Sequence, residues 1–133
     1  MIEIYSGEEL YHLVVRAADF KEGRVDIIQP HNFIQCSMLK LKNGQTFKPH
    51  KHIYKQGPSR IIAQESWVVI QGKVRAIFYD ENNKVIRKAP LFAGDASFTL
   101  KGGHTYEILE DNTLVYEFKT GPYTGQENDK EFI

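Results

Sequence analysis

From about residue 25 onward the sequence consists of short runs of β-branched and aromatic residues separated by Gly, Asn, Asp and Pro. This alternation is typical of an antiparallel β protein. The segments 42–44, 71–73 and 80–83 contain residues that tolerate positive φ or bond their own backbone, so they favour tight turns. We therefore predict strands at 25–28, 33–42, 46–52, 66–71, 74–79, 84–87, 96–100, 104–108 and 113–119.

The first twenty residues show a different pattern. Ser6 and Glu9 are spaced as a capping box, and Leu10, Leu13, Val14 and Ala17 form one apolar stripe, which predicts a helix over 6–20. A chain of 133 residues fits one hydrophobic core. We therefore expect a single all-β domain with one N-terminal helix, divided into a helical segment at 1–24, a β-barrel at 25–123 and a polar tail at 124–133.

Composition excludes several classes of partner. Seventeen basic and seventeen acidic side chains cancel to a net charge of zero, so no global field attracts nucleic acid. We find no apolar run of about eighteen residues and expect no membrane partner.

Cys36 is the single cysteine, and the start of the chain lacks the pattern of a secretion signal, so we expect a cytoplasmic protein. A neutral barrel with an exposed edge strand also favours a homodimer.

Three histidines and one glutamate are candidates for a metal site. His50 and His52 lie two apart on a predicted strand, so their side chains face the same side. His104 begins a strand after two glycines, and Glu65 immediately precedes another strand. Three imidazoles and one carboxylate suit Fe, Mn, Zn, Ni or Cu and leave coordination positions open. The His-x-His pair by itself is about as often a solvated feature of an edge strand.

The wider spacing resembles the two motifs of the cupins. In the first motif five residues separate a glycine from His-x-His, and six residues separate a glutamate from a second glycine. The matching residues here are Gly44, His50, His52, Glu65 and Gly72. The second motif resembles Gly94-Asp95, a strand, and Lys101-Gly102-Gly103-His104. The segment 53–64 between the histidine pair and the glutamate is longer than in many cupins.

A narrower resemblance covers roughly residues 30 to 133. Segments 49–52, 67–79, 117–123 and 129–132 look like those of the small cupin-fold metalloproteins encoded beside surface-polysaccharide (O-antigen) biosynthesis genes, the WbuC-like group. The resemblance implies a cupin jelly-roll β-barrel and one divalent metal ion, Fe, Zn, Mn or Ni, held by His50, His52, Glu65 and His104. It also implies a sugar-related setting.

These features favour a metal-dependent enzyme acting on a sugar or sugar-nucleotide intermediate of polysaccharide synthesis. Two alternatives are a metal-independent nucleotide-sugar isomerase or epimerase with a histidine base, and a non-catalytic sugar-binding module. An oxygenase is a further alternative if the metal is iron. The catalytic residues are not assigned by the sequence, and a small sugar-like molecule is the expected ligand.

Four further residues are candidates for substrate binding. His31 and Asn32 precede a long strand, although a role in stabilising the turn after Pro30 is at least as common. Arg60 lies on the inserted loop and has the planar fork that binds phosphate or carboxylate, although a solvated loop arginine is the more frequent case. Tyr106 is two residues from His104 and shares its face.

Overall fold

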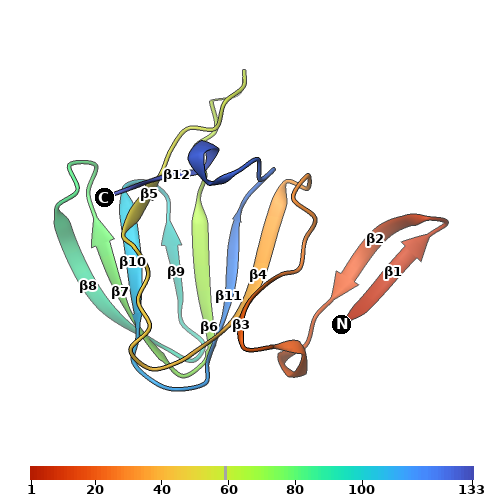
Figure 1. The fold of residues 1–133 in the computed structure, drawn as a ribbon, viewed down its shortest axis with the longest axis horizontal. Coiled ribbons are helices and arrows are strands. Elements are labelled where there is room, and N and C mark those ends of the chain that lie inside the picture. The colour runs from red at the N-terminus through yellow and green to blue at the C-terminus, as the bar shows by residue number, and fades with distance from the viewer. Residues whose placement is uncertain (59) are drawn as a thin grey trace.

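The computed structural model describes residues 1–58 and 60–133. Two five-stranded antiparallel sheets face each other as a barrel (Figure 1). The first sheet has the order β12-β5-β10-β7-β8, with β12 Lys130–Phe132, β5 His50–His52, β10 Gly103–Ile108, β7 Lys73–Tyr79 and β8 Val85–Phe92. The second has the order β3-β4-β11-β6-β9, with β3 Gly23–Asp26, β4 Ile34–Leu41, β11 Thr113–Thr120, β6 Glu65–Gln71 and β9 Ala96–Thr99.

The apolar core fills one end of the barrel. Inward-facing residues alternate along each strand, as in β6, where Glu65, Trp67 and Val69 are buried and their neighbours are less so. Along β10 the core ends at Tyr106, and His104 follows toward the other end. The buried cluster consists of Leu39, Leu41, Trp67, Val69, Val74, Ala76, Leu91, Tyr106, Ile108 and Val115.

Most predicted strands are confirmed, but the strand predicted at 25–28 lies at Gly23–Asp26, and two others differ in length by several residues. The strand predicted at 84–87 continues to Phe92 through Pro90. Because β8 lies at the edge of its sheet, Pro90 removes no hydrogen bond from an interior ladder. The strand predicted at 46–52 is regular only over His50–His52, and Thr46 forms an isolated bridge with Glu107.

The predicted helix over 6–20 is wrong. Strands β1 (Ile2–Ser6) and β2 (Glu9–Val14) form a separate hairpin that projects from the barrel (Figure 1). Ser6 pairs with Glu9 across the hairpin instead of capping a helix, and Gly7 has φ +63° in the two-residue turn. Glycine first in such a turn is typical of a type II′ hairpin. Residues Ala17–Asp19 form a short 3₁₀ turn, η1.

The described part of the chain contains no helix with the length and apolar character needed to span a membrane.

The C-terminal segment returns to the barrel. A second 3₁₀ turn, η2, covers Gln126–Asn128, and β12 pairs with β5. Lys130 lies opposite His52, and Phe132 lies opposite His50. Residues at opposite positions of an antiparallel pair place their side chains on the same face. The end of the chain therefore adds a strand beside the histidine pair.

Candidate metal centre

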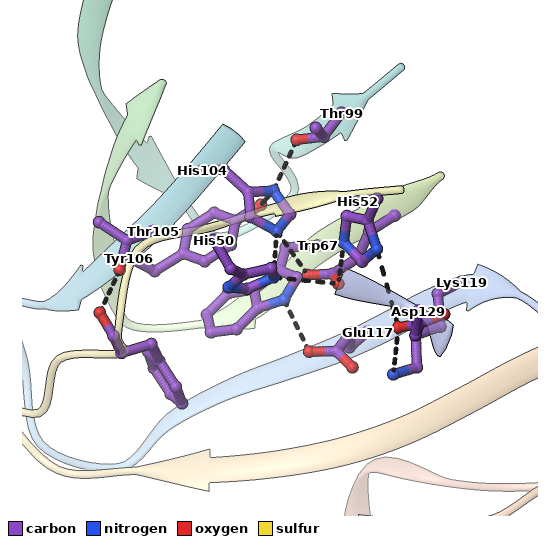
Figure 2. A network of polar contacts seen from close by, with 12 residues as sticks. His50, His52, Trp67, Thr99, His104, Thr105, Tyr106, Glu117, Lys119 and Asp129 are labelled. Carbon is purple, nitrogen blue, oxygen red and sulfur yellow. Dashed lines mark hydrogen bonds and ion pairs between the residues drawn. The ribbon is translucent and has the colours of Figure 1, made fainter. Parts of the chain in front are cut away.

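The candidate ligands come from both sheets. His50 and His52 point inward from β5, and His104 on β10 lies directly opposite His50. Glu65, the first residue of β6, approaches from the other sheet. The four side chains meet at the polar end of the barrel, and Figure 2 shows the three imidazoles pointing toward one another.

The potential donor atoms converge on one point. One nitrogen or oxygen from each of the four residues lies within 4.8 Å of the others, and all four residues are buried. His104 Nε2 is 3.0 Å from His50 Nε2 and 3.3 Å from Glu65 Oε1. His52 Nε2 is 3.0 Å from Glu65 Oε2. These distances place three ring nitrogens and one carboxylate around a common centre.

The opposite ring nitrogens face fixed polar groups. His50 Nδ1 lies 3.1 Å from the Lys48 carbonyl oxygen, and His104 Nδ1 lies 2.6 Å from Thr99 Oγ1. A carbonyl oxygen only accepts hydrogen bonds, so Nδ1 of His50 carries the proton. In a neutral ring this leaves the Nε2 lone pair of His50 directed toward the centre.

Asp129 lies behind the third imidazole. His52 Nδ1 is 3.7 Å from Asp129 Oδ2 and, within the described residues, has no hydrogen-bond partner. The Asp129 carboxylate is 1% exposed and contacts the amines of Lys55 at 3.2 Å and Lys119 at 3.5 Å. Figure 2 shows Lys119 beside Asp129. A carboxylate behind a ligating histidine is a common way to orient the ring and raise its basicity.

The donor chemistry fits a divalent transition metal. Two imidazole nitrogens 3.0 Å apart, one with its lone pair inward, need a proton or a cation between them. Neutral imidazole suits Zn, Fe, Ni and Cu, and the carboxylate supplies one negative charge. The four residues can therefore hold a divalent ion with positions left for a small ligand.

Electrostatics at the centre favour the ligating forms. Burial lowers the pKa of His50 and outweighs the opposing hydrogen bond with Glu65, which favours the neutral ring. Burial acts to raise the pKa of Glu65, but the charge and hydrogen bonds of the surrounding histidines outweigh burial. The pKa of Glu65 therefore lies well below its ordinary value, and the side chain is a carboxylate.

A cavity of about 560 Å³ opens beside the centre. One wall is aromatic: Trp67 stacks on Tyr106 with ring centroids 3.8 Å apart, and Phe47 packs edge-on against Trp67. Trp67 Nε1 donates to Glu117 Oε2 at 3.0 Å, and Arg24 pairs with Glu117 Oε1 at 2.8 Å. The cavity thus has an ordered apolar wall next to a buried, charge-compensated carboxylate.

The other predicted binding residues occupy three different places. Tyr106 lines the cavity, and its hydroxyl lies 2.9 Å from Ser97 Oγ. Burial raises the pKa of Tyr106, so the phenol keeps its proton. His31 and Asn32 are exposed in the loop before β4, outside the cavity lining. Arg60 is exposed beside a separate hollow of about 430 Å³, in an insertion whose residue 59 lies outside the described residues. The roles of these four residues in binding stay predictions.

Several residues of the site were missed by the sequence reasoning. Thr99 and Asp129 contact ligand histidines, and Glu117 lies under the cavity. Glu117 and Lys119 are polar residues two apart on a strand, on the inward face, which is a signal for a functional wall. Asp129 gives no comparable local signal, because its partner His52 is far away in the sequence.

Comparison with known proteins identifies the fold. KdgF from Halomonas sp. superposes with a TM-score of 0.60 at 19% identity, covering 78% of this chain and 80% of that one. A cupin-2 domain protein from Shewanella frigidimarina gives 0.57 at 18% identity, covering 80% of this chain and 94% of that one. The chain has the cupin fold. The predicted jelly-roll barrel is thereby confirmed, without its N-terminal helix.

One similar structure has a polysaccharide setting. The capsular polysaccharide assembling protein CapF from Staphylococcus aureus gives a TM-score of 0.67 at 21% identity, with 92% of this chain covered. The chain spans 34% of CapF. No family model and no curated protein matches the sequence.

Proposed function

We propose that this cupin is a metal-dependent enzyme acting on a sugar or sugar-nucleotide intermediate of surface-polysaccharide biosynthesis, with isomerisation or epimerisation as the reaction. The observation that carries the proposal is the set of four buried donors within 4.8 Å of one another beside a cavity of about 560 Å³. Resemblance to the O-antigen cupins and the fold shared with CapF support the sugar setting.

The residues of the cavity have separate tasks in this proposal. His50, His52, Glu65 and His104 would hold one Fe, Zn, Mn or Ni ion, which supplies a Lewis acid that polarises a substrate oxygen when bound. The stacked Trp67 and Tyr106, each 2% exposed, form a dry aromatic wall that excludes water from one side of the cavity. The Tyr106 hydroxyl keeps its proton and can donate a hydrogen bond to a substrate oxygen.

Elemental analysis of protein purified without chelator or histidine tag tests the metal site. We expect near-stoichiometric metal in the wild type and loss of metal in His50→Ala and His104→Ala. Lys51→Ala is the matched control, because Lys51 lies between the two histidines and pairs with Glu131 outside the site. Folded wild-type protein without metal would contradict the proposal and favour the metal-independent isomerase.

Activity assays separate the remaining alternative. If the metal-loaded wild type binds sugars but converts none of the sugar nucleotides tested, the chain is a binding module rather than an enzyme. The proposed location is the cytoplasm, where a chain with Cys36 as its one cysteine needs no disulfide.

A homodimer is also part of this proposal. Exposed apolar side chains Ile2, Ile4 and Val14 lie on one face of the β1–β2 hairpin, and a two-stranded hairpin is marginally stable alone. An apolar groove of about 360 Å³ lies on the second sheet, with Phe98 and Leu100 more than half exposed. Exchange of hairpins between two copies would cover both surfaces in one symmetric contact.

A further inference from the structure

Three lysines line the cavity beside the metal centre. Lys48 precedes β5, Lys119 lies on β11 and Lys130 lies on β12, so three separate segments bring ammonium groups to one space. Lys119 and Lys130 are half-buried, and Lys48 is more exposed. This convergence of like charges requires a physical reason, because like charges repel one another.

The register of β12 directs two of its side chains toward the ligands. Lys130 lies opposite His52 and Phe132 lies opposite His50, so both side chains share the face of the histidine pair. The Phe132 ring lies under two cations, with Lys48 Nζ at 4.2 Å and Lys130 Nζ at 5.8 Å from its centroid. The aromatic ring thus holds two amines near each other at the mouth of the cavity.

The carboxylates of the cavity are already paired. Arg24 forms ion pairs with both Glu117 and Asp26, each at 2.8 Å. Asp129 is shared by Lys55 and Lys119, and Glu65 faces the metal centre. Across residues 1–58 and 60–133, neither Lys48 nor Lys130 forms an ion pair with a carboxylate.

An unpaired, half-buried ammonium is unfavourable without an anion. Lys130 lines the same cavity as the Lys119 ammonium and lies on the face of the sheet that carries His52. A divalent ion at the neighbouring centre would add more positive charge on the same side of the cavity.

We propose that Lys48, Lys119 and Lys130 form an anion subsite, and that the substrate carries a carboxylate or phosphate group bound there. This inference rests on the proposed function and narrows its substrate to a negatively charged sugar derivative. Ammonium groups act as compact point charges that bind either oxyanion without a fixed bidentate geometry. The sugar ring would then extend from the lysines toward the metal ligands.

Calorimetric titration of the metal-loaded protein with three probes at constant ionic strength tests the subsite. The probes are D-glucuronate, D-glucose 1-phosphate and neutral methyl D-glucoside. We expect at least one charged probe to bind about tenfold or more tightly than the neutral one, because only a charged probe can form a charge-assisted hydrogen bond with the lysines. The tighter of the two charged probes identifies the anion as carboxylate or phosphate.

Lysine variants test whether the preference for a charged probe depends on Lys48, Lys119 and Lys130. Lys48→Gln and Lys130→Gln should each remove most of the preference for the charged probe and leave the affinity for the neutral glucoside unchanged. Lys51→Gln is the control, because Lys51 lies on the same strand as the histidines but pairs with Glu131 on the other face. The melting temperature of Lys130→Gln should not fall, since the variant removes an uncompensated charge.

Three results would overturn the subsite: equal affinity for charged and neutral probes, no detectable binding of either charged probe, or a preference that survives in Lys130→Gln. Binding of the neutral glucoside to metal-loaded protein without a charge preference would leave the sugar-binding function standing. Protein that takes up no metal would instead contradict the proposed function itself.

Discussion

The two ends of the chain both form short strands, but only one of them belongs to the site. The β1–β2 hairpin is rich in apolar residues and projects away from the barrel (Figure 1). Strand β12 has only three residues, two of them charged, yet it pairs with β5 and lies beside the candidate ligands His50 and His52. The comparison shows that the pairing partner, and not apolar content, decides whether a terminal strand contributes to the cavity.

Truncating each end of the chain in turn tests this difference. The C-terminal truncation should have the largest effect on stability and metal content. A chain ending at Thr124 loses Asp129 and the cover of β5, which leaves the Lys55 and Lys119 amines without their buried partner. We expect a loss of about 3–5 kcal/mol in the free energy of unfolding, as for a broken buried ion pair, and no bound metal. Urea unfolding and elemental analysis measure both quantities.

Removal of residues 1–15 is the matched truncation. It should leave the metal content unchanged and the unfolding of the barrel nearly unchanged, because β1 and β2 pair only with each other in the described structure. If the N-terminal deletion unfolds the barrel or releases the metal, the distinction between the two ends is wrong.

A single substitution sharpens the comparison at the C-terminal end. Asp129→Asn keeps the shape of the side chain but removes the charge near His52 Nδ1. We expect metal affinity to fall about 10- to 100-fold, the usual cost of losing the group that orients a ligating histidine. Competition with a chromophoric chelator measures the affinity.

Asp95→Asn provides the control for Asp129→Asn, because Asp95 accepts a hydrogen bond from the Phe92 amide in an exposed turn. Unchanged metal affinity in Asp129→Asn would show that Asp129 serves only the two lysines.

The sequence was sufficient for the parts of the site that depend on local spacing. His50 and His52 share a face because side chains alternate along a strand, and Glu65 and His104 were placed by their positions in the two motifs. The positions of most barrel strands and turns along the chain also followed from local patterns, whereas the jelly-roll architecture was implied by the resemblance to cupins. The structure brings these four residues together as the pattern indicated.

The remaining features depend on register and could not be read from local patterns. Lys130 lies opposite His52, 78 residues earlier in the chain, and nothing near Lys130 indicates that pairing. The hairpin was missed because Leu10, Leu13 and Val14 fit a helical stripe. Gly7 was the overlooked signal, since its positive φ makes the turn that reverses the chain.

Introducing charged residues into the β1–β2 hairpin tests its proposed role in dimer formation. Replacing Ile2 and Ile4 with Lys should convert a dimer to a monomer and change the free energy of unfolding of each barrel by less than about 0.5 kcal/mol, because both side chains are exposed. Sedimentation velocity measures the association. Glu8→Lys in the turn is the control, and monomeric wild-type protein would contradict the homodimer.

The smallest expected effect concerns an ion pair of the barrel at β3. Burial acts to raise the pKa of Asp26, but the Ser37 hydroxyl at 2.6 Å and Arg24 at 2.8 Å outweigh it, and the pKa is lowered from 3.8. Lys119 adds to this lowering, while Glu117 shares Arg24. Because the folded-state pKa is depressed, the stabilisation is present above the ordinary value and is lost as pH falls through the folded value.

Asp26→Asn should therefore lower the free energy of unfolding near neutral pH by less than about 1 kcal/mol, since the carboxylate is largely solvated. In acid, below the folded pKa of Asp26, the difference between the variant and the wild type should disappear. Urea unfolding at a series of pH values measures this dependence. A difference that persists in acid would mean that Asp26 stabilises the barrel through its shape and hydrogen bonds, and not through its charge.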